Sequence, residues 1–261
     1  MRILFIGDIV GKPGRRAVSG LLDNIKSSYD IDFVIANAEN ASGGFGVTRK
    51  VVEELLSCGI DILTSGNHIW DKKEIISGFD QERQLLRPAN YPTGNPGTGS
   101  VIVYTSEGQK VGVLNVLGRV FMNNIDCPFK TAIGEVKKLK AETNVILIDI
   151  HAEATSEKMA MGWYLDGMVS AVIGTHTHIQ TADERILPEG TAYITDVGMT
   201  GAMDSVIGMK KHIIIERFLT QRPQKFEVAK GDIQLNAIVT DIDPKTGRST
   251  GISRLKMNLA H

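Results

Sequence analysis

The chain has 261 residues, which at about 150 residues per domain allows one large α/β domain or two small ones. Hydrophobic residues make up 42% and charged residues 23%, values that exclude a disordered chain, a collagen-like repeat and a fibrous coil. With 29 Lys and Arg against 30 Asp and Glu, the net charge of −1 excludes a bulk positive field for a long nucleic acid but not a small anionic ligand.

Short apolar segments alternate with longer amphipathic segments along the chain. The apolar segments predict buried strands at residues 3–6, 33–36, 60–64, 101–104, 111–116, 145–150, 171–173 and 192–194. The amphipathic segments predict helices at residues 15–28, 48–58, 131–141 and 155–168. Because strands and helices alternate, the sequence predicts a layered α/β fold.

The remaining segments indicate how the sheets are organised. Residues 101–116 predict a β-hairpin, so we expect mixed rather than purely parallel sheets. The tail from residue 225 to 257 predicts further strands, interrupted near residues 243–247, and residues 87–99 predict a long irregular loop. Since the sequence has no composition break and no internal repeat, we expect a single domain over residues 1–261.

The cysteines and the N-terminus indicate the cellular setting. Cys58 and Cys127 are each isolated from any second cysteine or close histidine, which fits neither a disulfide framework nor a thiolate zinc site. The apolar run before Asp8 is too short for a signal peptide, and no segment has the roughly 18 apolar residues of a membrane helix. We therefore expect a cytoplasmic protein that is neither exported nor inserted into a membrane.

Side chains typical of metal ligands follow five of the predicted strands. They are Asp8, Glu39 and Asn40, Asn67 and His68, His151, and His176 and His178. The carboxyl ends of adjacent strands in a layered α/β fold converge on one crevice, so residues far apart in the sequence can meet there. The sequence therefore predicts a shared site at these strand ends.

Each of these residues also has a simpler explanation when it is considered alone. Asp8 could cap a helix, Asn67 could stabilise a turn, and His151 could be an ordinary buried histidine at a strand end. His176 and His178 are more specific, because alternate residues of an extended segment face the same side and present two imidazoles together. Because all five strand ends carry such residues, a shared metal site is favoured over five unrelated explanations.

The ligand types indicate the class of metal. Carboxylates, amides and imidazoles without a thiolate suit manganese, iron, zinc or a similar ion. The set is too large for one ion, whereas two ions about 3.5–4 Å apart, bridged by a carboxylate and a hydroxide, would use all of it. Such a pair suits an in-line displacement at phosphorus, because it stabilises both the attacking and the leaving oxygen.

The same blocks of sequence resemble a known family. Asp8 after the first strand, Gly66-Asn67-His68 and the segment 174–178 are similar to the motifs of calcineurin-like metallophosphoesterases. Residues 38–44 and 196–201 resemble the YmdB-type bacterial branch, and the resemblance spans nearly the whole chain. Val10 stands where the wider superfamily has the histidine of its D-x-H motif, and Glu39-Asn40 replaces the G-D-x-x-D block, which fits the YmdB-type pattern.

This resemblance implies a fold, a ligand set and an activity. It implies a four-layer α/β/β/α sandwich with two mixed sheets, a homo-oligomer, and hydrolysis of 2′,3′-cyclic nucleotides. Two transition-metal ions, iron or manganese or both, are implied. One would be held by Asp8, Glu39, Asn40 and His178, and the other by Glu39, Asn67, His151 and His176. Glu39 would bridge the ions, and His68 would be the proton donor.

The chemistry of a phosphodiester supports this hypothesis independently. Its alkoxide leaving group is poor, so hydrolysis at neutral pH needs a hydroxide, charge compensation for the phosphoryl oxygens, and an acid. Two bridged cations would supply the first two, and His68 beside Asn67 is placed to supply the third, since imidazole titrates near neutral pH. Release of the 2′-oxygen would leave a 3′-monophosphate.

The sequence leaves two alternatives to a cyclic-nucleotide phosphodiesterase open. The same site could act on RNA ends or phosphomonoesters, although the near-neutral charge favours a small substrate. The chain could also be a regulatory protein that binds a nucleotide without turnover, which would not need a proton donor such as His68.

Two segments near the predicted site have open interpretations. The glycine-rich residues 42–46 are either a flexible loop or a place where substrate approaches the backbone. Asp196 and the methionines of residues 199–209 form either a wall over the site or part of the core.

Overall fold

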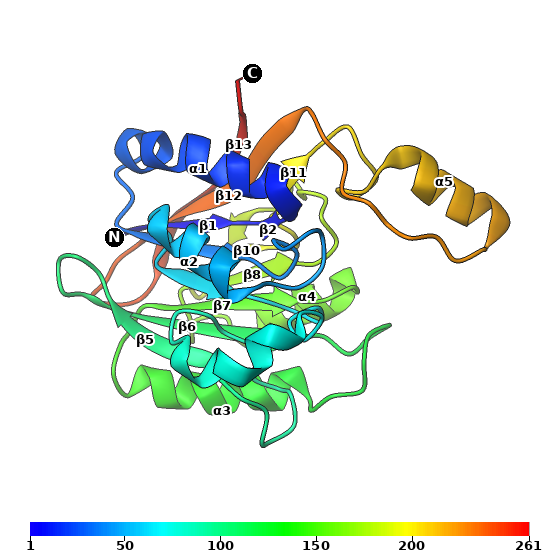
Figure 1. Ribbon diagram of the computed structural model, residues 1–261. Helices are drawn as coiled ribbons and strands as arrows, with labels where there is room; N and C mark the ends of the chain where they lie inside the picture. The colour runs from blue at the N-terminus through cyan, green and yellow to red at the C-terminus, as the bar shows by residue number, and fades with distance from the viewer. Residues whose placement is uncertain (261) are drawn as a thin grey trace.

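The computed structural model describes residues 1–260, which form two β-sheets packed face to face between layers of helices (Figure 1). The first sheet has the order β2-β11-β12-β1-β3-β4, with β13 paired to β12. Its strands are β1 (Arg2–Ile6), β2 (Asp8–Ile9), β3 (Phe33–Asn37), β4 (Ile62–Thr64), β11 (Met199–Ala202), β12 (Ile233–Ile242) and β13 (Ser249–Asn258).

The second sheet has the order β5-β6-β7-β8-β10-β9. Its strands are β5 (Ser100–Tyr104), β6 (Lys110–Leu117), β7 (Ile146–His151), β8 (Ala171–Thr175), β9 (Arg185–Ile186) and β10 (Ala192–Ile194). The helices are α1 (Gly11–Ser28), α2 (Arg49–Ser57), the 3₁₀ helix η1 (Lys73–Gln81), α3 (Pro128–Lys140), α4 (Thr155–Tyr164) and α5 (Lys211–Thr220).

Both sheets are mixed, as the hairpin predicted. The pairs β1·β3, β3·β4, β6·β7, β7·β8 and β8·β10 are parallel, whereas β5·β6 and β1·β12 are antiparallel. The parallel strands of both sheets carry the candidate residues at their carboxyl ends, so the fold directs the chain from each of them to one edge of the sandwich.

Strand residues alternate between two apolar environments, and this alternation produces the four layers. In β1, Ile3 and Phe5 point into the core between the sheets, where Val113 and Leu147 of the second sheet meet them. The intervening residues of β1 pack against α1 and α2, and the outer face of the second sheet packs against α3 and α4. Figure 1 shows the sheets between these helices, so the expected α/β/β/α sandwich is confirmed.

Two sequence predictions at element ends were wrong for backbone reasons. The helix predicted at residues 155–168 ends at Tyr164, because the chain turns at Gly167, which has a left-handed φ of 76°. The strand predicted from residue 225 begins only at Ile233, since Gly231 and Asp232 have φ values of 86° and 44° that interrupt an extended conformation. The 3₁₀ helix η1 was not predicted.

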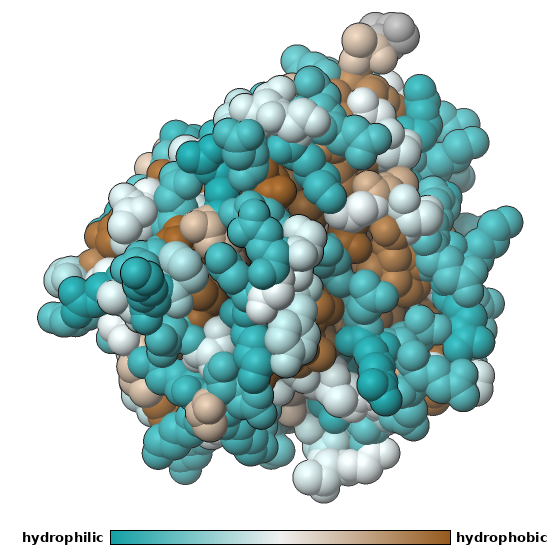
Figure 2. All heavy atoms as spheres, turned by 90° about the vertical axis from the view of Figure 1, so that its left-hand side faces the viewer, coloured by the Kyte–Doolittle hydropathy of each residue, from teal (hydrophilic) through white to brown (hydrophobic). Residues whose placement is uncertain are grey.

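The segment between β11 and β12 leaves the body of the molecule and carries α5 (Figure 1). Of the residues in α5, only Ile214 is buried. Hydrophilic side chains cover most of the face of the molecule that Figure 2 shows, as is usual for the surface of a folded protein. Within residues 1–260, no helix combines the length and the apolar character that crossing a membrane requires.

Candidate metal centre

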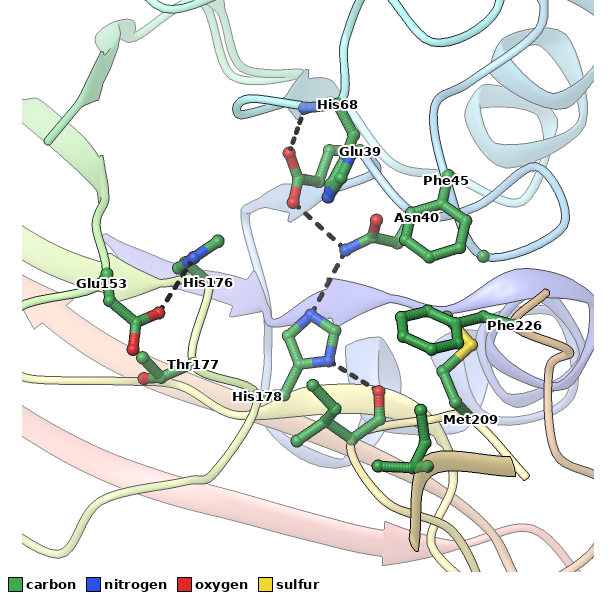
Figure 3. A pocket seen from close by; sticks show the side chains of 13 residues that line it. Glu39, Asn40, Phe45, His68, Glu153, His176, Thr177, His178, Met209 and Phe226 are labelled. Atoms are coloured by element: carbon green, nitrogen blue, oxygen red, sulfur yellow. Dashed lines mark hydrogen bonds and ion pairs between the residues drawn. The ribbon is translucent and has the colours of Figure 1, made fainter. Parts of the chain in front are cut away.

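The eight polar residues singled out in the sequence lie together at one edge of the sandwich. They are Asp8 at the start of β2 just after β1, Glu39 and Asn40 after β3, Asn67 and His68 after β4, His151 at the end of β7, and His176 and His178 after β8. Figure 3 shows that several of these side chains face one another across a shared cavity. Neither sheet alone could assemble this group, because each supplies only part of it.

Glu39 is at the centre of the cluster and is fully buried. Its Oε1 lies 2.9 Å from His151 Nε2 and accepts a hydrogen bond of 3.2 Å from Asn40 Nδ2, and its Oε2 accepts one of 3.1 Å from the backbone N–H of His68. Burial alone would raise the pKa of Glu39, but the His151 imidazole outweighs it and lowers the pKa to about 2. Glu39 is therefore an anion that contacts its neighbour Asn40 and two other segments that build the site.

Two imidazoles face each other beside this carboxylate. His176 Nδ1 lies 3.0 Å from His151 Nε2, and with Glu39 these atoms could hold one metal ion. Burial opposes protonation of His151, but Glu39 raises its pKa to about 9, whereas burial and the charge of His151 lower the pKa of His176 to about 3. At neutral pH the pair therefore carries one positive charge, because His151 is protonated and His176 is neutral.

A buried network orients His151 from its other side. Its Nδ1 lies 2.8 Å from the hydroxyl of Thr175, which donates a hydrogen bond of 2.6 Å to Asp149 Oδ1. Asn37 and Thr64 donate to the second oxygen of Asp149, and burial raises the pKa of this carboxyl to about 6. A hydrogen bond on the far nitrogen is how proteins fix the ring of a metal-binding histidine.

Three buried oxygens of the cluster accept no hydrogen bond within residues 1–260. They are Asp8 Oδ1, Asn40 Oδ1 and Asn67 Oδ1. Asp8 Oδ1 lies 3.8 Å from His151 Nδ1 and 3.9 Å from His178 Nε2, too far for hydrogen bonds. Buried polar atoms are normally satisfied, so three unsatisfied oxygens in a cluster with imidazole nitrogens fit the coordination of metal ions.

The Asn40 amide is placed so that either of its ends can serve the site. Its Nδ2 lies 3.2 Å from both Glu39 Oε1 and His178 Nε2. A half-turn of the amide would exchange its nitrogen and oxygen, and would move the oxygen that is now unsatisfied so that it faces the same carboxylate and imidazole. Asn40 therefore fits a ligand that offers its oxygen once a cation is present.

The backbone is strained where it presents His176 and His178. Their φ values are 94° and 65°, a region that non-glycine residues rarely adopt and that costs about 1–3 kcal/mol each. The residue between them, Thr177, is held by Asp196, whose Oδ2 accepts hydrogen bonds from its backbone N–H at 3.0 Å and from its hydroxyl at 2.6 Å. Lys158, also fully buried, pairs with this carboxylate at 2.7 Å.

This ion pair resolves one open interpretation from the sequence. Asp196 is not a wall of the cavity, because it lies behind Thr177 and anchors the histidine-bearing loop from the core side. Met209 does line the cavity, whereas Met199 is buried in β11. The role of Lys158 was missed, since in the sequence it is one charged residue of a predicted amphipathic helix.

Gly66 leaves space that any side chain would fill. A Cβ atom at this position would lie 2.3 Å from His151 Nε2 and 2.4 Å from Glu39 Oε2. The space in front of these two ligand atoms therefore depends on the absence of a side chain at residue 66.

The cluster opens into a cavity of about 360 Å³, a size suited to a small ligand. Besides the polar residues, the cavity is lined by Phe45, Met209, Ile214 and Phe226. Phe45 is in the glycine-rich loop, where Gly44 and Gly46 adopt left-handed φ values of 97° and 72°. This loop is therefore a shaped wall of the cavity, and Phe226 is a cavity residue that sequence reasoning missed.

Comparisons with known proteins agree along the full chain. A family model described as "YmdB-like protein" matches residues 4–255. A Bacillus subtilis (strain 168) protein named 2′,3′-cyclic-nucleotide 2′-phosphodiesterase is 50% identical over 261 residues, which cover 100% of this chain and 98% of the relative.

Two solved structures are similar in fold and sequence. A hypothetical protein from Thermus thermophilus has a TM-score of 0.92 and 42% identity, and the match covers 99% of each chain. A Mycoplasma pneumoniae protein described as a novel phosphatase has a TM-score of 0.93 and 35% identity, with 99% of this chain and 93% of that chain covered.

Replacing Gly66 by Ala is expected to weaken metal binding by at least about 10-fold, because the new methyl group would occupy the space before His151 and Glu39. Titration of metal-free protein with Mn²⁺ in a calorimeter measures this. The matched control is Gly134→Ala in α3, where an added Cβ has no neighbour within 4 Å and the metal affinity should be unchanged. Equal affinities of Gly66→Ala and the wild type would contradict the assignment.

Metal uptake is expected to release at least about one proton at pH 7. His151 is protonated below a pKa of about 9 in the metal-free protein, and a histidine must be unprotonated to bind a metal. The apparent affinity should therefore increase as the pH rises towards 9. Calorimetry in buffers of different ionisation enthalpy counts the released protons, and uptake without proton release at pH 7 would show that His151 is not a ligand.

Proposed function

Because the chain belongs to the YmdB-like protein family, we propose that it is a metal-dependent phosphodiesterase that hydrolyses 2′,3′-cyclic nucleotides to 3′-monophosphates. The observation that carries this proposal is the group of three buried, unsatisfied oxygens beside Glu39, His151 and His176. The name of the Bacillus subtilis relative supports the choice of substrate.

We propose two groups of ligands that share Glu39. Asp8, Glu39, Asn40 and His178 would hold one ion, and Glu39, Asn67, His151 and His176 would hold the other. The short contacts of Glu39 with both Asn40 and His151 support its place in both groups. Iron and manganese suit these nitrogen and oxygen donors, and when bound they would compensate phosphoryl charge and lower the pKa of water.

His68 is the proposed proton donor. Its Nδ1 is tied to Asp71 Oδ2 at 2.9 Å, so Nε2 is the nitrogen that can serve a substrate in the cavity. In the reaction water gives up a proton to solvent and its oxygen bonds to phosphorus as hydroxide, while the bond from phosphorus to the 2′-oxygen breaks. His68 gives a proton to that oxygen and regains one from solvent. Its backbone N–H already binds Glu39, which places the ring beside the ligands.

A panel of three substrates tests this function against its alternatives. The metal-loaded protein should convert adenosine 2′,3′-cyclic phosphate to the 3′-monophosphate faster than it hydrolyses a phosphomonoester or a short RNA. Faster hydrolysis of the monoester or the RNA would favour the same site acting on other phosphates. Absence of turnover on all three, with nucleotide binding retained, would favour a regulatory binding protein.

Replacing His68 by Ala should lower kcat by about 10²–10⁴, the usual contribution of a general acid, while metal content stays nearly intact. The backbone N–H that binds Glu39 is kept in this variant, which is why the ligands should hold. Steady-state kinetics and elemental analysis of the same preparation provide both readouts. His212→Ala is the control, because this histidine is exposed on α5, and loss of both metals in His68→Ala would refute the role.

We further propose that the protein is a homo-oligomer. The apolar side chains of Phe218 and Leu219 on α5 are 71% and 80% exposed, an arrangement typical of a surface that meets a second copy. Light scattering should give a mass above the 28.4 kDa of one chain, and Leu219→Glu should lower it. A wild-type mass equal to one chain would rule the oligomer out.

A further inference from the structure

We propose that Phe45 and Phe226 form a subsite that binds the nucleobase of the substrate by stacking. This inference rests on the proposed function and adds to it the part of the site that separates a nucleotide from any other cyclic phosphodiester.

The cavity has two chemically different ends. One end contains the carboxylate and imidazoles around Glu39, His176 and His178, and the other is apolar and contains Phe45 and Phe226 (Figure 3). A ligand that fills both ends must carry a phosphate at one side and a flat apolar group at the other. A nucleotide has this shape, whereas an inorganic phosphate or a sugar phosphate does not.

The two rings offer aromatic faces at the apolar end. Their planes are 25° from parallel and their centroids are 6.3 Å apart, and both side chains are half-buried. Two stacking contacts of about 3.5 Å need about 7 Å between the ring planes, so the two rings must move apart for a base to enter. Phe226 belongs to an irregular segment, which can accommodate such a movement more easily than a strand.

The position of Phe45 matches the bonding of a 2′,3′-cyclic nucleotide. In this substrate the carbon that carries the base is bonded directly to the carbon that carries the 2′-oxygen. The base must therefore lie close to the group that protonates the departing 2′-oxygen. Phe45 contacts His68 edge to face with ring centroids 5.0 Å apart, so the aromatic pair is next to the proposed proton donor.

Three separate segments of the chain hold the pair. Phe45 is supplied by the glycine loop, where a Cβ at Gly44 would lie 2.9 Å from side-chain atoms of both Met209 and Val228. Phe226 is supplied by the segment that returns from α5, and the Arg217 guanidinium of that helix lies 4.9 Å from its ring centroid. The arm that carries α5 is thereby coupled to the active cavity.

This arrangement also predicts the selectivity of the subsite. The other hydrophobic residues that line the cavity are Ile207, Met209 and Ile214, and their side chains cannot form hydrogen bonds with the edge of a base. Recognition by stacking alone tolerates every base, because each has an aromatic face. We therefore expect the four 2′,3′-cyclic nucleotides to be hydrolysed with similar efficiency, and an enzyme selective for one base would argue against the subsite.

The test compares adenosine 2′,3′-cyclic phosphate with glycerol 1,2-cyclic phosphate, which has the same five-membered cyclic diester and no base. In metal-loaded Phe226→Leu, the KM for the nucleotide should rise by about 10-fold, since stacking of one base on an aromatic ring is lost. The ratio of kcat/KM for the nucleotide over the glycerol compound should fall by about the same factor. Phe226→Tyr keeps an aromatic face and should restore the ratio.

The control is Phe121→Leu, which makes the same change at a phenylalanine that is 89% exposed and outside the cavity, and it should keep the wild-type ratio. An unchanged ratio in Phe226→Leu would show that the two rings only pack against each other, and would overturn the subsite. A similar loss with both substrates would overturn it as well, because it would indicate general damage to the site.

Calorimetry keeps the two proposals separable. The metal-loaded wild type should bind adenosine 3′-monophosphate more tightly than glycerol 2-phosphate, and Phe226→Leu should lose this difference without any need for turnover. If the wild type hydrolyses neither cyclic substrate but shows that difference, the proposed reaction fails and the base subsite stands. Equal binding of the two ligands by the wild type would remove the base subsite, whatever the rates of hydrolysis.

Discussion

The structure depends on one electrostatic constraint, which is the burial of Glu39 and several unsatisfied oxygens where strands of two sheets end. Glu39 is an anion that has no contact with solvent, and Asp8, Asn40 and Asn67 each present a buried oxygen without a hydrogen bond in the described chain. In the metal-free protein, the proton on His151 supplies the balancing charge. Metal ions at the proposed site would satisfy the same oxygens more completely, because they accept several lone pairs at once.

Keeping such a cluster in place requires support from residues that do not contact a ligand. Thr175 and Asp149 fix the ring of His151, and Asp196 with Lys158 holds the strained turn that carries His176 and His178. Removing one partner of a buried ion pair usually lowers the stability of the folded protein by about 3–5 kcal/mol. Loss of either Lys158 or Asp196 would therefore destabilise the fold as well as the loop that carries the two histidines. These buried interactions thereby keep His176 and His178 in a strained backbone conformation at the candidate metal centre.

The cavity joins this charged cluster to an aromatic end that comes from another part of the chain. The glycine loop after β3 and the arm between β11 and β12 meet there, although about 180 residues lie between Phe45 and Phe226 in the sequence. The charged end is the one that we propose binds metal ions and acts on the phosphodiester. In our proposal the aromatic end favours a nucleotide, so that reactivity and recognition would come from different elements of the same fold.

The sequence by itself determined the alternation of strands and helices, the mixed sheets and the eight polar residues that follow strand ends. These are local properties, since apolar periodicity and a polar residue at the end of a strand are visible in a few neighbouring positions. The tertiary structure alone decided that Lys158 pairs with Asp196, that Thr175 orients His151, and that Phe226 meets Phe45. Each of these contacts joins segments distant in the chain, and it exists only because the two sheets and the returning arm pack in one particular way.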